Sequence, residues 1–159
     1  MELFWINDVI AVATRPRGGD WLRDDLAAAQ IRGVRVIVSC LMREEESDFG
    51  LGAESEETRS LGMDFVRVPI ADQGVPQPGV VEEVLSAMGR TSGPDRKVAI
   101  HCRQGLGRSP LVAGAILVRT GMTARDAWEA ISRARGQPVP ETDEQRRWLT
   151  RFAATVVRQ

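Results

Sequence analysis

Cysteine and histidine are scarce in this chain. Its 159 residues include only two cysteines, Cys40 and Cys102, and one histidine, His101, and tyrosine is absent altogether. Two cysteines are too few for a disulfide scaffold, and with a single histidine they cannot form a four-ligand Cys/His zinc site. We therefore expect neither a metal site nor a cofactor.

Long apolar segments and an excess of one charge are also missing. The longest apolar run, Leu111–Val118, is far shorter than the ~20 residues that cross a bilayer. Acidic and basic residues nearly balance, with a net charge of -1, and no basic stripe indicates a nucleic-acid partner. The N-terminal segment lacks the positive and apolar regions of a signal peptide. We expect a soluble cytoplasmic protein without nucleic-acid or membrane partners, and a monomer is compatible with these features.

The apolar patterns predict one α/β domain over residues 1–159. Short runs rich in valine and isoleucine alternate with segments of helical periodicity, and no Pro/Gly-rich linker divides the chain. The expected fold class is a central, mainly parallel sheet flanked by helices. The expected strands are Leu3–Ile6, Val9–Ala13, Val34–Ser39, Phe65–Ile70 and Val98–Ile100, and the expected helices lie within residues 20–32, 78–88, 111–118, 123–136 and 148–156.

An acidic stretch, Glu44–Glu57, stands apart from these patterns. Runs of like charge are typical of solvent-facing segments. We therefore predict a solvated helix face or loop there, and we assign it no chemical role.

The candidate site follows the Val98–Ile100 strand. The segment reads His-Cys-Arg-Gln-Gly-Leu-Gly-Arg-Ser-Pro from His101 to Pro110, so that a glycine-containing loop leads from a cysteine into a helix. Backbone N–H groups of such a loop converge at the helix N-terminus and favour a phosphate dianion. Arg108 adds a planar fork for two phosphate oxygens. The same positive field lowers the pKa of the Cys102 thiol below the ordinary value of ~8.5, which favours the nucleophilic thiolate.

An inert buried cysteine beside a plain glycine turn is the alternative interpretation. It does not explain an arginine six positions after Cys102, followed by Ser-Pro at a helix start. The Cys-x5-Arg spacing with the preceding His101 resembles the signature of the cysteine-dependent protein tyrosine phosphatase superfamily. Four further segments are similar to its compact dual-specificity branch, and most of all to the kinase-associated phosphatase type: Arg15–Leu22, Gly33-Val34, Pro69–Pro76 and Glu141–Gln145.

This resemblance implies a three-layer protein tyrosine phosphatase fold and hydrolysis of phosphate monoesters through a cysteinyl-phosphate, without a metal. The expected substrate is phosphotyrosine in a protein, with phosphoserine and phosphothreonine also accepted. A phosphoinositide or another small phosphate ester is the alternative substrate. A non-catalytic phosphoprotein-binding module and a rhodanese-type sulfurtransferase are the alternatives to this activity. The presence of Cys102 argues against the binding module, and the Arg108 fork argues against the sulfurtransferase.

The resemblance also implies roles for single residues. Cys102 attacks phosphorus, while Arg108 and the loop amides hold the phosphate oxygens. Asp72, in a loop rich in glycine and proline, is our candidate for the acid that protonates the leaving group. The alternative for Asp72 is an ordinary turn aspartate. Other candidates for the acid are Asp20, Asp95 and, least suited, Asp64 beside a strand.

Ser109 and Gln145 each have two interpretations. Ser109 can donate a hydrogen bond to the Cys102 sulfur, or it can cap the following helix. Gln145 resembles a glutamine that positions the attacking water in some superfamily members, or it forms a capping box with Thr142. We expect His101 to support the loop backbone. Arg17 either recruits an anionic substrate or is solvated, and the rim and floor of the phosphate site are expected from Arg103, Gln104, Gly105, Leu106 and Gly107.

Cys40 directly follows the Val34–Ser39 strand. A buried core thiol is the simplest interpretation. A further hypothesis is a reversible disulfide between Cys40 and Cys102 under oxidation, as in some relatives with a cysteine near this point.

Overall fold

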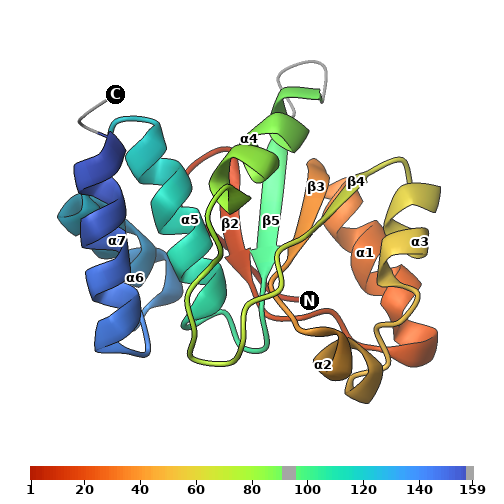
Figure 1. The fold of residues 1–159 in the computed structure, drawn as a ribbon. Coiled ribbons are helices and arrows are strands. Elements are labelled where there is room, and N and C mark those ends of the chain that lie inside the picture. The colour runs from red at the N-terminus through yellow and green to blue at the C-terminus, as the bar shows by residue number, and fades with distance from the viewer. Residues whose placement is uncertain (91–95, 157–159) are drawn as a thin grey trace.

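A computed structural model describes residues 1–90 and 96–156. Its centre is a five-stranded sheet in the order β1-β2-β5-β3-β4 (Figure 1). β1 runs antiparallel to β2, whereas β2, β5, β3 and β4 are parallel to one another. The expected mainly parallel sheet is thus confirmed. The strands are β1 (Leu3–Trp5), β2 (Ile10–Ala13), β3 (Val34–Ser39), β4 (Asp64–Arg67) and β5 (Lys97–His101).

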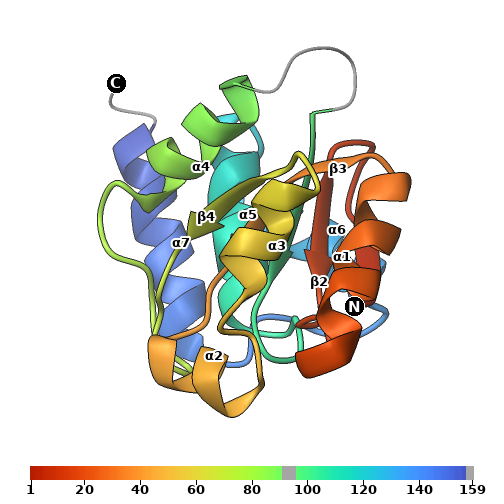
Figure 2. The same cartoon turned by 90° about the vertical axis from the view of Figure 1, so that its right-hand side faces the viewer.

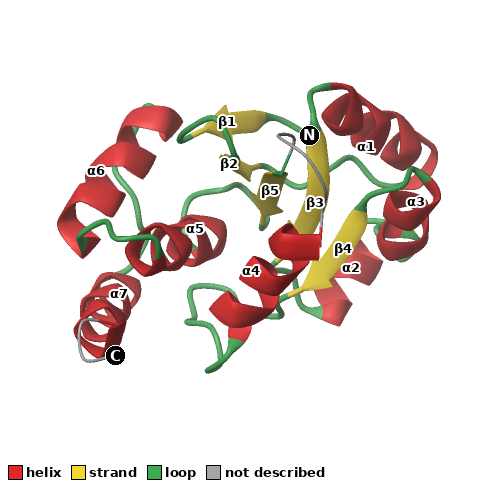
Figure 3. Ribbon diagram, turned by 90° about the horizontal axis from the view of Figure 1, so that it is seen from above, coloured by secondary structure: helices red, strands yellow, loops and turns green. Residues whose placement is uncertain are grey.

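Helices cover both faces of the sheet, which gives the molecule three layers (Figure 3). One face packs against α1 and α3, and the other packs against α4 and α5, with α6 and α7 packed on α5. The helices are α1 (Leu22–Ile31), α2 (Arg43–Asp48), α3 (Glu54–Ser60), α4 (Val80–Arg90), α5 (Arg108–Arg119), α6 (Ala124–Arg135) and α7 (Asp143–Val156), and a 3-10 helix, Gly19–Trp21, precedes α1.

The strands are apolar on both faces because each face has a helical layer to contact. Val38 and Ile100 belong to the core on the α4 and α5 side, whereas Ile37 and Ala99 belong to the core on the α1 side. Successive side chains of a strand alternate between the two faces. Continuous apolar runs, rather than alternating ones, are therefore the pattern that these strands require.

Residues at the ends of α6 lie where the sequence predicted them. Thr123 caps the start, and its Oγ1 accepts a hydrogen bond from the Asp126 N–H at 3.1 Å. Gly136 ends the helix in the left-handed conformation, with a φ of 70°.

The central helix, α5, is buried along the whole run from Leu111 to Val118, as predicted. Within residues 1–90 and 96–156, neither this helix nor any other is long and apolar enough to cross a membrane.

The acidic stretch Glu44–Glu57 is only in part the solvated surface that we expected. It covers most of α2 and the start of α3. Glu44, Asp48 and Glu56 are exposed, whereas Glu46 and Glu54 are 4% and 1% exposed. Glu46 pairs with Arg67 at 2.9 Å, and Glu54 contacts His101. The prediction was wrong for these two carboxylates, because charge density alone does not reveal that distant cationic side chains meet them. The strand predicted over Phe65–Ile70 also ends earlier, at Arg67.

The carboxyl ends of the parallel strands lie at one edge of the sheet, the lower edge in Figure 1. The segments after β2, β3, β4 and β5 therefore meet there, and α2 lies beside them (Figure 2). In α/β sheets this edge is where ligands bind. The fold thus brings the loop that starts at Cys102 together with segments from earlier in the chain.

Candidate active site

The segment from Cys102 to Arg108 forms a loop between β5 and α5. Gly105 has a φ of 72°, and a Cβ at this position would lie 2.8 Å from the Ala13 carbonyl oxygen, so the loop needs glycine here. α5 begins at Arg108 with Gly107 as its N-cap, which places Ser109 inside the first turn. The alternative that Ser109 caps this helix is therefore wrong, since the helix begins one residue before it.

The Cys102 sulfur is surrounded by hydrogen-bond donors. The Gly105 N–H donates to Sγ at 3.3 Å, and the Ser109 Oγ lies 3.3 Å from the same atom. Burial of Cys102 opposes ionisation, but the hydrogen bonds from Ser109 and Gly105 and the charge of Arg108 outweigh it, so the pKa of the thiol is lowered. The loop therefore favours the thiolate.

The Arg108 guanidinium is held in a fixed orientation and is 2% exposed. Its Nη1 and Nη2 donate to the two carboxylate oxygens of Glu45 at 2.7 and 2.9 Å, and Nη1 also donates to the Ile70 carbonyl at 3.0 Å. Asp72 Oδ1 lies 3.5 Å from Nη2. The hydrogen bonds from Arg108 lower the pKa of Glu45, which keeps that carboxylate ionised. Such a bidentate pair fixes the plane of the fork before any ligand binds.

His101 is fully buried, and both of its ring nitrogens face oxygen acceptors. Nε2 lies 2.6 Å from Glu54 Oε1, and Nδ1 lies 3.2 Å from the Cys102 carbonyl oxygen. Burial lowers the pKa of His101, but the Glu54 carboxylate and the Cys102 carbonyl outweigh burial, and the net shift is upward. A doubly protonated ring satisfies both acceptors. His101 therefore contacts the first peptide of the loop, as expected of a supporting residue.

Arg135, in the last turn of α6, holds the outer side of the loop. Its Nε donates to the Gly105 carbonyl at 2.8 Å, its Nη2 donates to the Gln104 carbonyl at 3.2 Å, and its guanidinium lies 3.6 Å over the Phe4 ring. The Gln104 carbonyl and the Gly105 N–H belong to one peptide group and point in opposite directions. Fixing this carbonyl therefore directs the N–H toward the Cys102 sulfur.

A small pocket of about 100 Å³ joins several of the predicted residues. Asp72 lines it from the segment after β4, and its side chain is 59% exposed. Gly105, Gly107 and Ser109 lie in the loop or helix beneath without lining the pocket. The lining residues are Asp72, Cys102, Arg103, Gln104, Leu106, Arg108 and Glu141.

The other candidates for the acid do not line this pocket. Asp64 begins β4, at the opposite edge of the sheet, and lies 3.6 Å from Arg90. Asp20 is exposed in the 3-10 helix. Asp95 lies outside the described residues. Among the aspartates that the structure describes, Asp72 is thus the one that meets the pocket.

Gln145 connects α7 to the segment that carries Asp72. Its Nε2 donates to the Gly74 carbonyl at 3.1 Å, and the same atom would lie 3.1 Å from a Cβ on Gly107. The capping box with Thr142 is also present: the Gln145 N–H donates to Thr142 Oγ1 at 3.2 Å, and the Thr142 N–H donates to Gln145 Oε1 at 3.3 Å. The cap interpretation is confirmed, and the same side chain also lies between the two loops.

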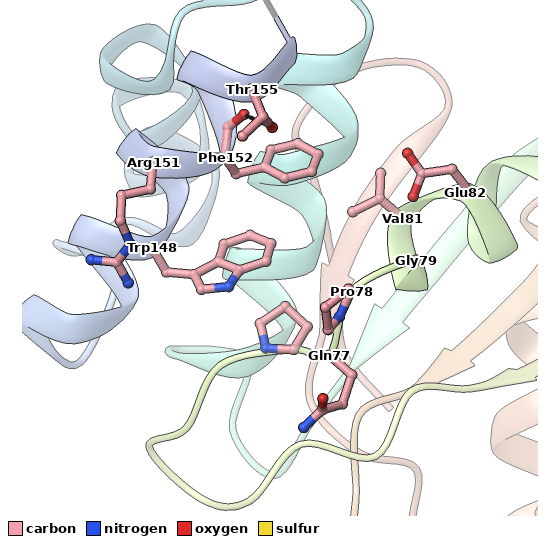
Figure 4. Close-up of a pocket in the computed structure, with 10 residues that line it drawn as sticks. Gln77, Pro78, Gly79, Val81, Glu82, Trp148, Arg151, Phe152 and Thr155 are labelled. Carbon is pink, nitrogen blue, oxygen red and sulfur yellow. Dashed lines mark hydrogen bonds between the residues drawn. The ribbon is translucent and has the colours of Figure 1, made fainter.

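Beyond Gly74, the Asp72 segment borders a larger pocket of about 450 Å³ between α4 and α7. Figure 4 shows Gln77, Pro78 and Gly79 on one side of it, with Trp148 and Phe152 on the other. The two aromatic rings are stacked, with centroids 5.2 Å apart. The segment is therefore attached to α7 at Gly74 and then borders an apolar groove.

Cys40 is a buried thiol next to the loop, as predicted. Its N–H donates to the His101 carbonyl at 2.9 Å. Burial, with the charge of the Cys102 thiolate, raises the pKa of Cys40 well above its ordinary value. Both cysteines are free, and their oxidation to a disulfide stays a prediction.

Sequence reasoning missed Glu45, Glu54, Arg135 and Glu141. Glu45 and Glu54 lie in the acidic stretch to which we assigned no role, and Arg135 lies among other arginines of α6. The one signal for Glu45 and Glu54 is their position after β3, because the segments that follow parallel strands meet at the carboxyl edge of the sheet. Glu141 begins the Glu141–Gln145 segment, which is similar to the dual-specificity branch, and it lines the pocket, but we assigned it no role of its own.

Comparison with known proteins agrees with this geometry. A family described as "Polymorphic toxin system, DSP-PTPase phosphatase" matches residues 11–122. A probable protein tyrosine phosphatase type IVA A of Dictyostelium discoideum is 32% identical over 83 residues, which cover 51% of this chain and 50% of that protein. Cyclin-dependent kinase inhibitor 3 of Rattus norvegicus is 33% identical over 86 residues, covering 53% of this chain and 41% of that protein.

A solved structure shows the same fold over nearly the whole chain. It is the kinase-associated phosphatase with its catalytic cysteine replaced by serine, at a TM-score of 0.78 and 22% identity, covering 94% of this chain and 88% of that one. The chain spans half or less of the length of the two curated relatives. The resemblance to compact dual-specificity phosphatases is confirmed, and the family match covers most of the chain. This protein belongs to the DSP-PTPase phosphatase family of polymorphic toxin systems.

Proposed function

We propose that this chain is a protein phosphatase that hydrolyses phosphate monoesters through a cysteinyl-phosphate. The observation that carries the proposal is the buried Cys102 sulfur, with donors from Gly105 and Ser109, in one pocket with the fixed fork of Arg108. Phosphotyrosine in a protein is the proposed substrate, with phosphoserine and phosphothreonine also accepted.

In the first step, the Cys102 thiolate attacks phosphorus, and the bond between phosphorus and the leaving oxygen breaks. Arg108 and the loop N–H groups hold the remaining phosphate oxygens as their charge redistributes. Protonated Asp72 gives its proton to the leaving oxygen. This role is supported by the position of Asp72, which lines the same pocket as Cys102 and lies 3.5 Å from the Arg108 Nη2.

In the second step, water attacks phosphorus and the phosphorus–sulfur bond breaks. The Asp72 carboxylate accepts a proton from the water, and the Ser109 hydroxyl donates a hydrogen bond to the departing sulfur, which returns as a thiolate. Phosphate then leaves. Gln145 holds the Asp72 segment through the Gly74 carbonyl, and its further action on the attacking water stays a prediction from the resemblance.

The test is hydrolysis of a chromogenic aryl phosphate by the wild type, Cys102→Ser and Cys40→Ala, with a chelator present. We expect Cys102→Ser to lose at least about 10⁴-fold in kcat, because the reaction has lost its nucleophile. Cys40→Ala is the matched control, since it alters the other buried cysteine and should retain turnover. Turnover that persists in Cys102→Ser would contradict the mechanism, and an inactive wild type would favour the phosphoprotein-binding module.

A further inference from the structure

Two arginines meet on one aromatic ring at the rim of the Cys102 pocket. The guanidinium carbon of Arg15, after β2, lies 4.3 Å from the centroid of the Phe49 ring, and that of Arg103 lies 5.3 Å from it. Phe49 directly follows α2 as its C-cap residue, so three separate segments supply this cluster. The Arg15 N–H also donates to the Arg103 carbonyl at 3.3 Å, which joins the two arginine-bearing segments. Stacking on a shared ring restricts both side chains before any ligand binds.

These two arginines differ from their neighbours in their ion pairs, although the charge of Arg103 helps to lower the pKa of Glu45. Arg108 pairs with Glu45, Arg67 pairs with Glu46, and Arg17, which we considered for recruiting an anionic substrate, pairs with Asp25 at 2.6 Å. Within residues 1–90 and 96–156, no carboxylate forms a salt bridge with Arg15 or Arg103. The Arg15 Nη1 donates to the neighbouring Pro16 carbonyl, at 3.1 Å.

The pocket also carries acidic groups. Asp72 and Glu141 line it together with Arg103, and both are exposed. The rim therefore presents cations from the Arg103 segment and carboxylates from the segments after β4 and before α7. A substrate with a second negative group is favoured only if that group lies toward Arg15 and Arg103.

We propose that Arg15 and Arg103, held on Phe49, bind a second anionic group beside the phosphorylated residue of a peptide substrate. This group is an acidic side chain or a second phosphorylated residue, and the inference rests on the proposed phosphatase function. A peptide fits better than an anionic membrane, because a membrane surface would also face the Asp72 and Glu141 carboxylates. A peptide can present its negative group on one side only.

The test uses matched phosphotyrosine peptides whose flanking position is alanine, glutamate or phosphoserine. The measurement is the ratio of kcat/KM for each anionic peptide to that for the alanine peptide, in the wild type, Arg15→Gln and Arg32→Gln. We expect the wild type to prefer the anionic peptides by about fivefold at low salt, and Arg15→Gln to reduce the ratio to about 1. Arg32→Gln removes the same charge from an exposed position after α1, at the opposite edge of the sheet, and should keep the wild-type ratio.

Phe49→Leu is the second variant, because it keeps both charges and removes the ring that holds them. We expect an intermediate ratio. A wild-type ratio of about 1, or a ratio unchanged in Arg15→Gln, would overturn the proposal. Faster hydrolysis of phosphoinositide vesicles than of every peptide, with the same dependence on Arg15, would replace the peptide by a lipid and also overturn it.

Failure of this inference is distinguishable from failure of the proposed function. Turnover of the aryl phosphate together with a peptide ratio of about 1 would support the phosphatase function and overturn the proposed subsite. If no substrate turns over, fluorescence anisotropy with Cys102→Ser and the labelled peptides measures the same ratio in Kd. The same arginine dependence in Kd supports the subsite even where catalysis fails.

Discussion

The two sides of the pocket are built differently. On one side, Cys102 and Arg108 are nearly inaccessible, and their reacting groups are held by donors and acceptors from α2, α5 and the loop itself. On the other side, Asp72 is 59% exposed, and its segment is attached through the Ile70 and Gly74 carbonyls.

This difference matches what the proposed mechanism requires of the two sides. A thiolate and an anion-binding fork act best when they are fixed before the substrate arrives, since no energy is then spent on orienting them during the reaction. An acid has to let the substrate in and then approach its leaving oxygen, and such segments make fewer buried contacts than the core. Changes on the Cys102 side should therefore affect every substrate, and changes on the Asp72 side should depend on the leaving group.

The strongest way to break the fixed side is Arg108→Lys. Lysine keeps the charge but cannot pair with both Glu45 oxygens and still offer a fork to phosphate, so we expect kcat/KM to fall about 10³-fold for all substrates. Steady-state kinetics with phenyl and activated aryl phosphates measures this loss. The control is Arg67→Lys, which alters the similar pair with Glu46 away from the pocket and should stay within about twofold. A loss of less than tenfold in Arg108→Lys would show that the fixed fork is dispensable.

A smaller and more selective loss should follow from Asp72→Asn. Without a proton donor, we expect kcat/KM for phenyl phosphate or a phosphotyrosine peptide to fall about 10²-fold. An activated aryl phosphate, whose leaving group needs no proton, should lose less than about tenfold. Asp20→Asn, at an exposed aspartate outside the pocket, is the matched control. Equal losses for both leaving groups would contradict the assignment of the acid.

The smallest effect concerns the free energy of unfolding and the buried pair of His101 and Glu54. The pKa of His101 is raised in the folded state, so its stabilising contribution is complete below the unfolded His pKa of about 6.5 and is lost as the pH rises through the folded pKa. Glu54→Gln removes the charge responsible. We expect the variant to lose about 2 kcal/mol of unfolding free energy at low pH and less at high pH.

Urea unfolding between about pH 5.5 and 8.5 measures this difference. Glu57→Gln is the control, since it alters a partly exposed glutamate of the same helix that pairs with Arg23. A difference between the wild type and Glu54→Gln that does not change with pH would show that His101 does not titrate against Glu54.

Local patterns predicted much of this molecule. The apolar runs located all five strands, and Thr123 and Gly136 marked the ends of α6. The Cys102–Arg108 spacing located the loop, because there the chemistry and the backbone turn are encoded in neighbouring residues. The capping box of Gln145 was also readable, since its partner Thr142 is three residues away.

Contacts between distant segments could not be predicted from the sequence. Glu45 binds Arg108 across 63 positions of sequence, and nothing local separates it from neighbouring surface carboxylates. Arg135 reaches the Gly105 carbonyl across 30 positions, from a helix with several other arginines. Ser109 was a possible cap by residue preference alone. The loop instead starts the helix at Arg108, with Gly107 as its N-cap. Partners that stabilise the site become visible only when the parallel sheet has brought the strand ends together.

In the proposed mechanism, Cys102 itself carries the phosphoryl group. Rapid acid quench of the wild type and of Asp72→Asn during turnover of an activated aryl phosphate, followed by peptide mass spectrometry, tests it most directly. We expect one added phosphoryl group on the peptide that contains Cys102, accumulating more in Asp72→Asn because the second step has lost its base. A phosphoryl group on another residue, or turnover with no phosphorylated peptide in either protein and an unmodified Cys102, would contradict it.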